Sequence, residues 1–80
     1  LMKDIIADET CAYILDKAEE LGVVCQARVT AWTESGDYPV PDGVEITGDL
    51  TQGEQAALTR VIAAELAIPA ERQYYVEDVE

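Results

Sequence analysis

The 80-residue chain contains no histidine, no phenylalanine, two cysteines and only five basic residues. Without histidine, the usual base that activates a serine or cysteine nucleophile is missing, and so is the commonest protein ligand for metals. Cys11 and Cys25 form no Cys-x-x-Cys pair, whereas a structural zinc site needs about four cysteine or histidine ligands. We therefore expect no catalytic residues, no metal site and no cofactor, and predict that the chain is not an enzyme.

The two thiols are expected to serve as small apolar groups, because unreactive cysteine is among the residues most often buried. Cys25 alternates with Val23 and Ala27 on one side of an expected strand, and Cys11 lies on the apolar side of an expected helix. We predict that both thiols are free and face the core. The alternative is a Cys11–Cys25 disulfide.

Positive charge is also scarce: 17 acidic residues against 5 basic ones give a formal net charge of −12. Nucleic-acid binding depends on Lys and Arg that displace counterions from phosphates, so nucleic acid is excluded as a partner. The chain also lacks a run of about 18 apolar residues, the length that a membrane-spanning helix requires. Membrane association is therefore expected only through segments outside this chain.

A first helix is predicted over residues 3–21, because apolar residues recur there at spacings of three and four. Gly22 follows at the position where a left-handed residue commonly ends a helix. Residues 1–9 belong either to a linker or to an extension of this helix. The apolar stripe consists of Ala7, Cys11, Ile14, Ala18 and Leu21.

Two strands are predicted next, because apolar and more polar residues alternate over 23–32 and again over 44–48. Between them, residues 33–43 contain Ser, Gly, Asp and two prolines, a composition typical of turns. The two strands are expected to form a hairpin with a long connection.

The second helix is expected to begin at a capping box, with Thr51 at the cap and Glu54 three residues later. Leu58, Ile62 and Leu66 share its apolar side with Val61. Pro69 cannot continue a helix, and the segment "QYYVE" that follows predicts a third strand beside the hairpin.

The resulting order is helix, strand, strand, helix, strand within a single domain of residues 1–80. This order predicts an α+β fold in which both helices pack on one face of a three-stranded sheet. The other face is then free. We expect Val24, Arg28 and Trp32 to lie on it, opposite Cys25 and Val29, with Tyr75 joining from the third strand.

These four residues form the candidate site, because Trp, Tyr and Arg are enriched at the energetic centres of protein interfaces. We therefore predict that a protein partner binds at these interface residues, Val24, Arg28, Trp32 and Tyr75. The alternative is that Trp32 only covers its own loop, together with Tyr38 or Pro39.

The chain resembles the C-terminal soluble domain of stage III sporulation protein AF over roughly residues 10–77. The matching segments are "YILDKAEELG", "PVPDGVEITG" and "LTRVIAAELAIPAERQYYV". Such domains are similar to the ring-building motif of secretion-system ring proteins, which has the same helix-strand-strand-helix-strand order.

The resemblance implies a non-enzymatic assembly module that contacts other protein subunits, with a second copy of the chain among the candidates. It also implies a membrane tether upstream of this chain and a place in the complex between mother cell and forespore. The alternative is a monomeric acidic domain with a regulatory or small-ligand-binding role.

Overall fold

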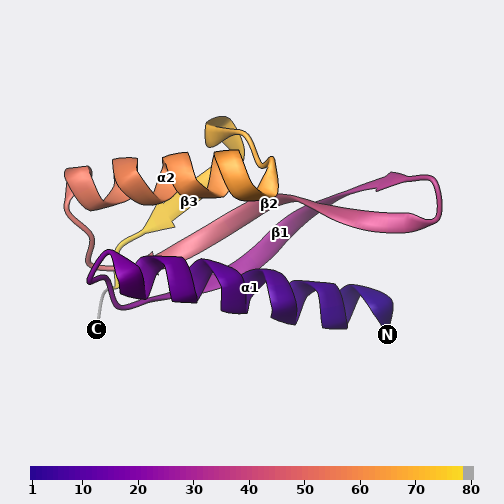
Figure 1. Cartoon of the computed structure of the whole chain (residues 1–80), viewed down its shortest axis with the longest axis horizontal. Coiled ribbons are helices and arrows are strands. Elements are labelled where there is room, and N and C mark those ends of the chain that lie inside the picture. The colour runs from indigo at the N-terminus through magenta and orange to yellow at the C-terminus, as the bar shows by residue number, and fades with distance from the viewer. Residues whose placement is uncertain (79–80) are drawn as a thin grey trace.

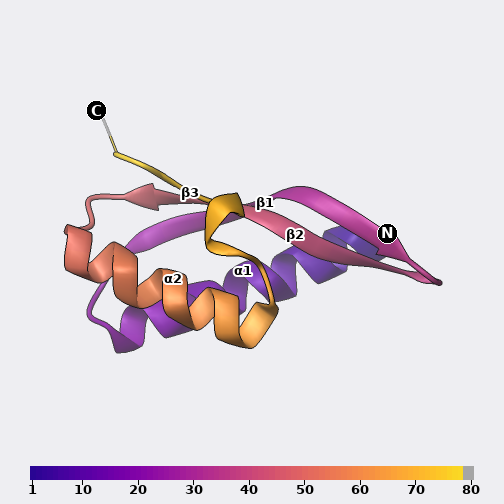
Figure 2. The same ribbon diagram turned by 90° about the horizontal axis from the view of Figure 1, so that it is seen from above.

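The computed structural model describes residues 1–78, except for the side chain of Ser35. The three strands form one sheet in the order β1-β2-β3, with β1 antiparallel and β3 parallel to the central β2. Both helices lie on the same face of this sheet (Figure 1, Figure 2). The predicted α+β fold and its element order are thus confirmed. The elements are α1 (Met2–Glu20), β1 (Cys25–Ser35), β2 (Tyr38–Gly48), α2 (Gln52–Leu66), the short 3-10 helix η1 (Ala70–Arg72) and β3 (Gln73–Val76).

Helix α1 begins at Met2, so residues 2–9 extend the helix and do not form a linker. At its other end, Gly22 adopts the left-handed conformation with φ of 78°. The N–H of Gly22 donates to the carbonyl of Glu19, and that of Val23 donates to the carbonyl of Ala18, each at 2.9 Å. This turn satisfies carbonyls that the helix end leaves free and directs the chain into β1.

Helix α2 starts at the predicted capping box. The Thr51 hydroxyl accepts from the Glu54 N–H at 3.1 Å, and the Glu54 carboxylate accepts from the Thr51 N–H at 2.9 Å. The helix ends at Leu66, and Ala67 takes the left-handed conformation with φ of 57°. Pro69 then prevents any return to the helix, and η1 carries the chain back to the sheet.

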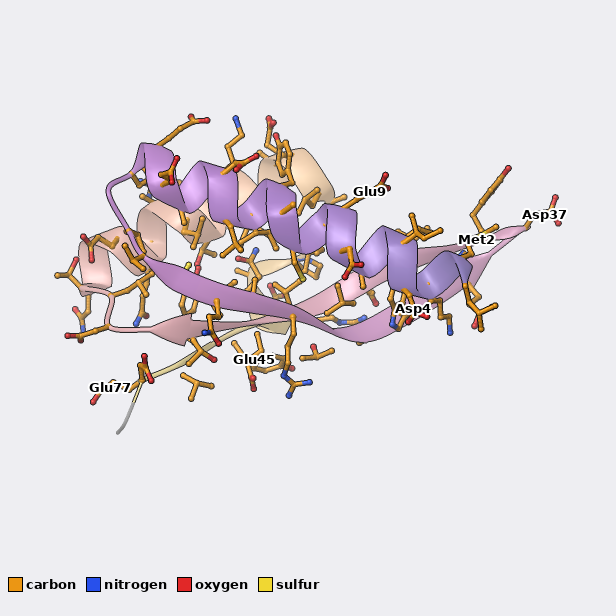
Figure 3. The ribbon with its side chains drawn as sticks, turned by 90° about the horizontal axis from the view of Figure 1, so that it is seen from below. Met2, Asp4, Glu9, Asp37, Glu45 and Glu77 are labelled. Atoms are coloured by element: carbon orange, nitrogen blue, oxygen red, sulfur yellow. The ribbon has the colours of Figure 1, made fainter. Side chains whose placement is uncertain are left out.

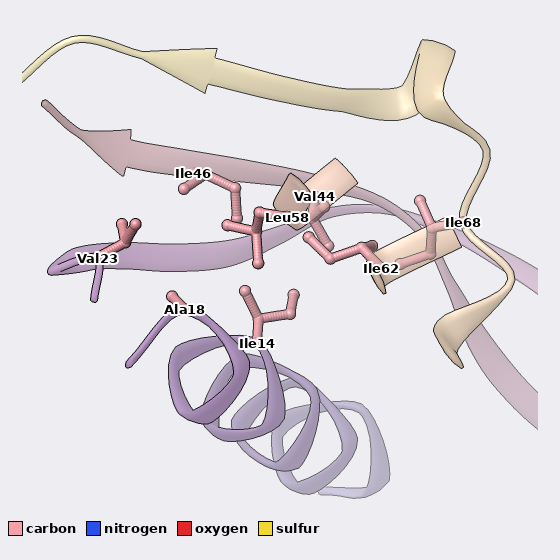
Figure 4. Close-up of a cluster of buried hydrophobic side chains, with 8 residues drawn as sticks. All are labelled: Ile14, Ala18, Val23, Val44, Ile46, Leu58, Ile62 and Ile68. Carbon is pink, nitrogen blue, oxygen red and sulfur yellow. The ribbon is translucent and has the colours of Figure 1, made fainter. Parts of the chain in front are cut away.

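The core lies between the sheet and the two helices, as Figure 4 shows. Its centre is β2, whose Val44 and Ile46 are fully buried under side chains of α1 and α2. Burying one such aliphatic side chain stabilises the fold by about 1.5–3 kcal/mol. The buried apolar residues are Ile14, Ala18, Val23, Val44, Ile46, Leu58, Ile62 and Ile68.

The hairpin is longer than the sequence indicates, and the prediction of a turn over residues 33–43 is wrong. Strand β1 continues to Ser35 and β2 starts at Tyr38, so only two residues make the turn. Pro39 and Pro41 fit inside β2 because β3 pairs only with Val44–Thr47. The proline half of β2 is bonded to β1 alone, and proline is tolerated where a strand has a free side.

Two irregularities interrupt the pairing of β1 with β2. Val29 pairs with Val44, Ala31 with Gly43, and Trp32 with Pro41, so Thr30 is an extra residue in β1 and Asp42 is an extra residue in β2. A Cβ atom on Gly43 would lie 2.9 Å from the Thr30 hydroxyl oxygen and 3.1 Å from the Ala31 Cβ. Both side chains therefore occupy the space above Gly43, and the in-and-out alternation of β1 reverses beyond this bulge.

Replacing Ile62 tests how α2 packs. Ile62→Asp places a carboxylate among apolar side chains and is expected to cost about 3 kcal/mol or more, a large part of a small domain's stability. Ala56→Asp adds the same group on the exposed side of α2 and should cost less than about 1 kcal/mol. Urea unfolding followed by circular dichroism measures both, and equal losses would contradict this packing.

Candidate functional site

The sheet surface turned away from α1 and α2 carries no helix within residues 1–78. We call it the open face. Figure 3 shows Glu45 on this side, pointing away from α1. Because paired residues share a face, the strand register places one side chain from each strand in every row. The centre of the open face consists of two such rows. One row is formed by Arg28, Glu45 and Tyr74, and the other by Gln26, Thr47 and Val76.

The central row contains an ion pair. Arg28 Nε donates to Glu45 Oε1 at 2.8 Å, and the two residues are direct partners in the β1–β2 register. This hydrogen bond raises the pKa of the Arg28 guanidinium. The Arg28 side chain is 66% exposed and that of Glu45 only 26%. Because exposed ion pairs contribute little to stability, the pair mainly holds Arg28 across the face while leaving it accessible.

A second ion pair lies toward the hairpin end of the open face. The Asp42 carboxylate accepts from the Thr33 hydroxyl at 2.9 Å and also from Arg72 Nη1. The open face thus holds two arginines and two carboxylates that pair with each other. The chain as a whole has a net charge of −12. These four side chains balance in charge, so the strand part of the open face is close to neutral, and six of the chain's acidic residues lie on α1, on the other side of the sheet.

Of the four predicted interface residues, the structure brings only Arg28 to the centre of the open face. Val24 precedes the first residue of β1 and is 93% exposed, at the edge of that face. Trp32 and Tyr75 lie on the opposite side of the sheet, with the helices.

The placement of Trp32 beside Arg28 is wrong. Lys3 Nζ, from the first turn of α1, lies 5.5 Å from the centre of the Trp32 ring, and it also donates to Glu34 at 3.1 Å. The bulge at Thr30 is the physical reason, because one extra residue moves every later side chain of β1 to the other face. A glycine inside a strand often marks a bulge, so Gly43 was the available signal.

The placement of Tyr75 is also wrong. Its hydroxyl lies 2.9 Å from that of Thr59 and donates to the carbonyl of Gln55 at 3.3 Å, both in α2. The buried Gln73 sets this orientation, because its amide donates to the carbonyls of Ile68 and Thr59.

Strand alternation then turns Tyr74 outward, and Tyr74 is 53% exposed on the open face. The two adjacent tyrosines of "QYYVE" are equivalent by residue type. The sequence alone did not distinguish them.

The two cysteines are free, as predicted, and both are half-buried. Burial raises the pKa of each thiol, and the nearby Asp8 carboxylate raises the pKa of Cys11 further. A reactive cysteine needs a lowered pKa, because the thiolate is the nucleophile. These two thiols therefore have the chemistry of packing groups.

A shallow groove of about 310 Å³ lies between α1 and α2, on the far side of the molecule from the open face. Within residues 1–78, Arg60 is the one basic side chain with no carboxylate within 4.0 Å. Over the same residues, no three His, Cys, Asp or Glu side chains gather in a metal-binding arrangement. The groove is lined by Lys17, Glu20, Leu21, Arg60, Val61, Ala64 and Glu65.

Comparison of the chain with protein-family models, with curated proteins and with solved structures gave no match. Across the part of the chain that the structure describes, no helix combines the length and the apolar character needed to cross a membrane.

The raised pKa values predict a loss of stability in alkali. Cys11, Cys25 and Tyr75 are all more easily ionised in the unfolded chain than in the folded one, because burial disfavours their charged forms. Their stabilising contribution is complete below the unfolded pKa values and is lost as pH rises through the folded ones. The urea concentration at the midpoint of unfolding should therefore decrease as the pH is raised from about 8 to about 11. The fall should be smaller in the double variant Cys11→Ala, Cys25→Ala, and an equal fall would contradict the assignment to the thiols.

Proposed function

We propose that the chain is a non-enzymatic protein-interaction module that binds other protein subunits through the open face of its sheet. The observation that carries this proposal is the charge balance of the open face in a chain with a net charge of −12. Another protein that approaches this face meets Arg28, Tyr74 and threonines, with no excess of carboxylates. Arginine and tyrosine are also the residue types that contribute most at interfaces.

The edges of the sheet favour contact through the face over the addition of a further strand. Strand β1 carries the bulge at Thr30, and the projecting half of β2 carries Pro39 and Pro41. Strand β3 is four residues long and is followed by Glu77 and Asp78. Bulges, prolines, short edge strands and charges are the features by which proteins prevent edge-to-edge pairing.

The resemblance to the soluble domain of stage III sporulation protein AF supports a more specific form of this proposal. In that form, the module belongs to a membrane-tethered complex in the space between mother cell and forespore. The shared helix-strand-strand-helix-strand order supports it. We expect the reading frame upstream of Leu1 to encode transmembrane helices and the neighbouring genes to be sporulation genes. An upstream frame without such helices would contradict the tether.

Site-specific photo-crosslinking tests the choice of surface. A photoreactive residue at Gln26 or Thr47, in the full-length protein in the cells that make it, should crosslink to protein partners, because both positions lie in the central rows. The matched control is Glu19, which is exposed on α1. Crosslinking at Glu19 but not at Gln26 or Thr47 would show that the interface lies elsewhere.

The groove between α1 and α2 favours a second candidate function, the binding of a small ligand. Its volume is at the lower end of the range for small-molecule sites, about 300–1,000 Å³. Arg60 beside Leu21 and Val61 suits an apolar molecule with one carboxylate. In this case octanoate should shift the amide resonances of Leu21 and Val61, and Arg60→Gln should weaken that effect. Unchanged resonances at saturating octanoate would exclude this ligand class.

A further inference from the structure

We propose that the partner of the open face is a second copy of the same chain, packed sheet against sheet about a two-fold axis. The axis lies between the two sheets, parallel to the strands and level with the midline between β1 and β2. This inference rests on the proposed function for its choice of surface. It adds the identity of the partner and the residues that meet.

The register of the central row carries the argument. Arg28 and Glu45 are direct partners on neighbouring strands. A two-fold axis along the strands and midway between them exchanges the two positions, because it maps β1 of one copy onto β2 of the other. Arg28 of each copy then lies over Glu45 of the partner subunit. A surface used twice by a two-fold dimer must be complementary to itself, and this row meets that requirement.

The same axis gives Tyr74 a role. The row continues from Arg28 and Glu45 to Tyr74 in β3, so the tyrosine of one copy comes to the outer side of Arg28 of the other. There it covers the free edge of β1 and one side of the guanidinium. Arginine beside an aromatic ring is a favourable contact once water is excluded.

Long-range charge also favours this arrangement. Two chains of net charge −12 repel each other in any orientation, and repulsion is weakest when their neutral surfaces meet. Face-to-face packing puts both copies of α1, with its six acidic residues, on the outside of the dimer. Salt screens the repulsion between these distant charges more than it weakens the close Arg28–Glu45 contacts.

Sedimentation analysis of the isolated chain at about 0.02 M and 0.5 M salt tests the proposal. We expect a monomer–dimer equilibrium that shifts toward dimer at the higher salt. Arg28→Glu should weaken dimerisation by at least about tenfold, because it places a carboxylate opposite Glu45 of the partner subunit at both of the equivalent contacts. Arg60→Glu makes the same change in net charge on the helix side and should leave the dimer within about threefold of the parent.

A charge exchange makes the test specific for the axis. Arg28→Glu alone makes the central row acidic, and Glu45→Arg alone makes it basic, so each variant should stay monomeric. An equimolar mixture of the two should form a heterodimer, because position 28 of each copy then faces an opposite charge at position 45 of the other. The double variant Arg28→Glu, Glu45→Arg should dimerise like the parent. Circular dichroism of every variant establishes that it is folded.

Three outcomes would overturn the inference. One is a parent chain that stays monomeric at both salt concentrations, and another is an Arg28→Glu variant that dimerises like the parent. The third is a mixture of the two single variants that stays monomeric. If the open face nevertheless crosslinks to a different protein in cells, the proposed function stands and only the second-copy partner is wrong. A dimer in vitro without any crosslink from Gln26 or Thr47 would instead contradict the proposed function in the cell.

Discussion

Strand β2 is the part of the molecule on which the other elements depend. It is bonded to β1 on one side and to β3 on the other, and its Val44 and Ile46 are covered by both helices. Since these two side chains point to the helices, Glu45 and Thr47 must point away from them. The buried aliphatic core and the polar open face are therefore two consequences of one alternating segment, residues 44–47.

The bulge at Thr30 determines what the open face is made of. Without the extra residue, Trp32 would lie with Arg28 and add a large apolar ring to the exposed side of the sheet. With it, Trp32 lies near Lys3 of α1, and the centre of the open face keeps threonine, paired charges and Tyr74. A monomer that exposes a broad aromatic patch tends to associate without selectivity. A binding surface that carries paired charges discriminates among partners, because an incorrect partner leaves some of those charges buried and unpaired.

Local signals predicted the fold well. Gly22, the Thr51–Glu54 box and Pro69 each determine the backbone within a few residues, and the elements they delimit lie where they were expected. The site was predicted less well, because the face of a side chain depends on the pairing of distant segments. Trp32 depends on Gly43 across the hairpin, and the sequence had placed Gly43 in a turn.

The parallel pairing of β3 has a consequence for the order in which the molecule assembles. Gln73 pairs with Val44 across about 30 residues, whereas β1 and β2 meet through a two-residue turn. The hairpin closes a short loop, and β3 closes a long one that requires α2 to be in place. With four residues on one partner strand, β3 is the strand whose amide protons should exchange first. Tyr74 and Val76, the aromatic and the aliphatic side chain of the two central rows, thus belong to the open face only while the last strand stays bound.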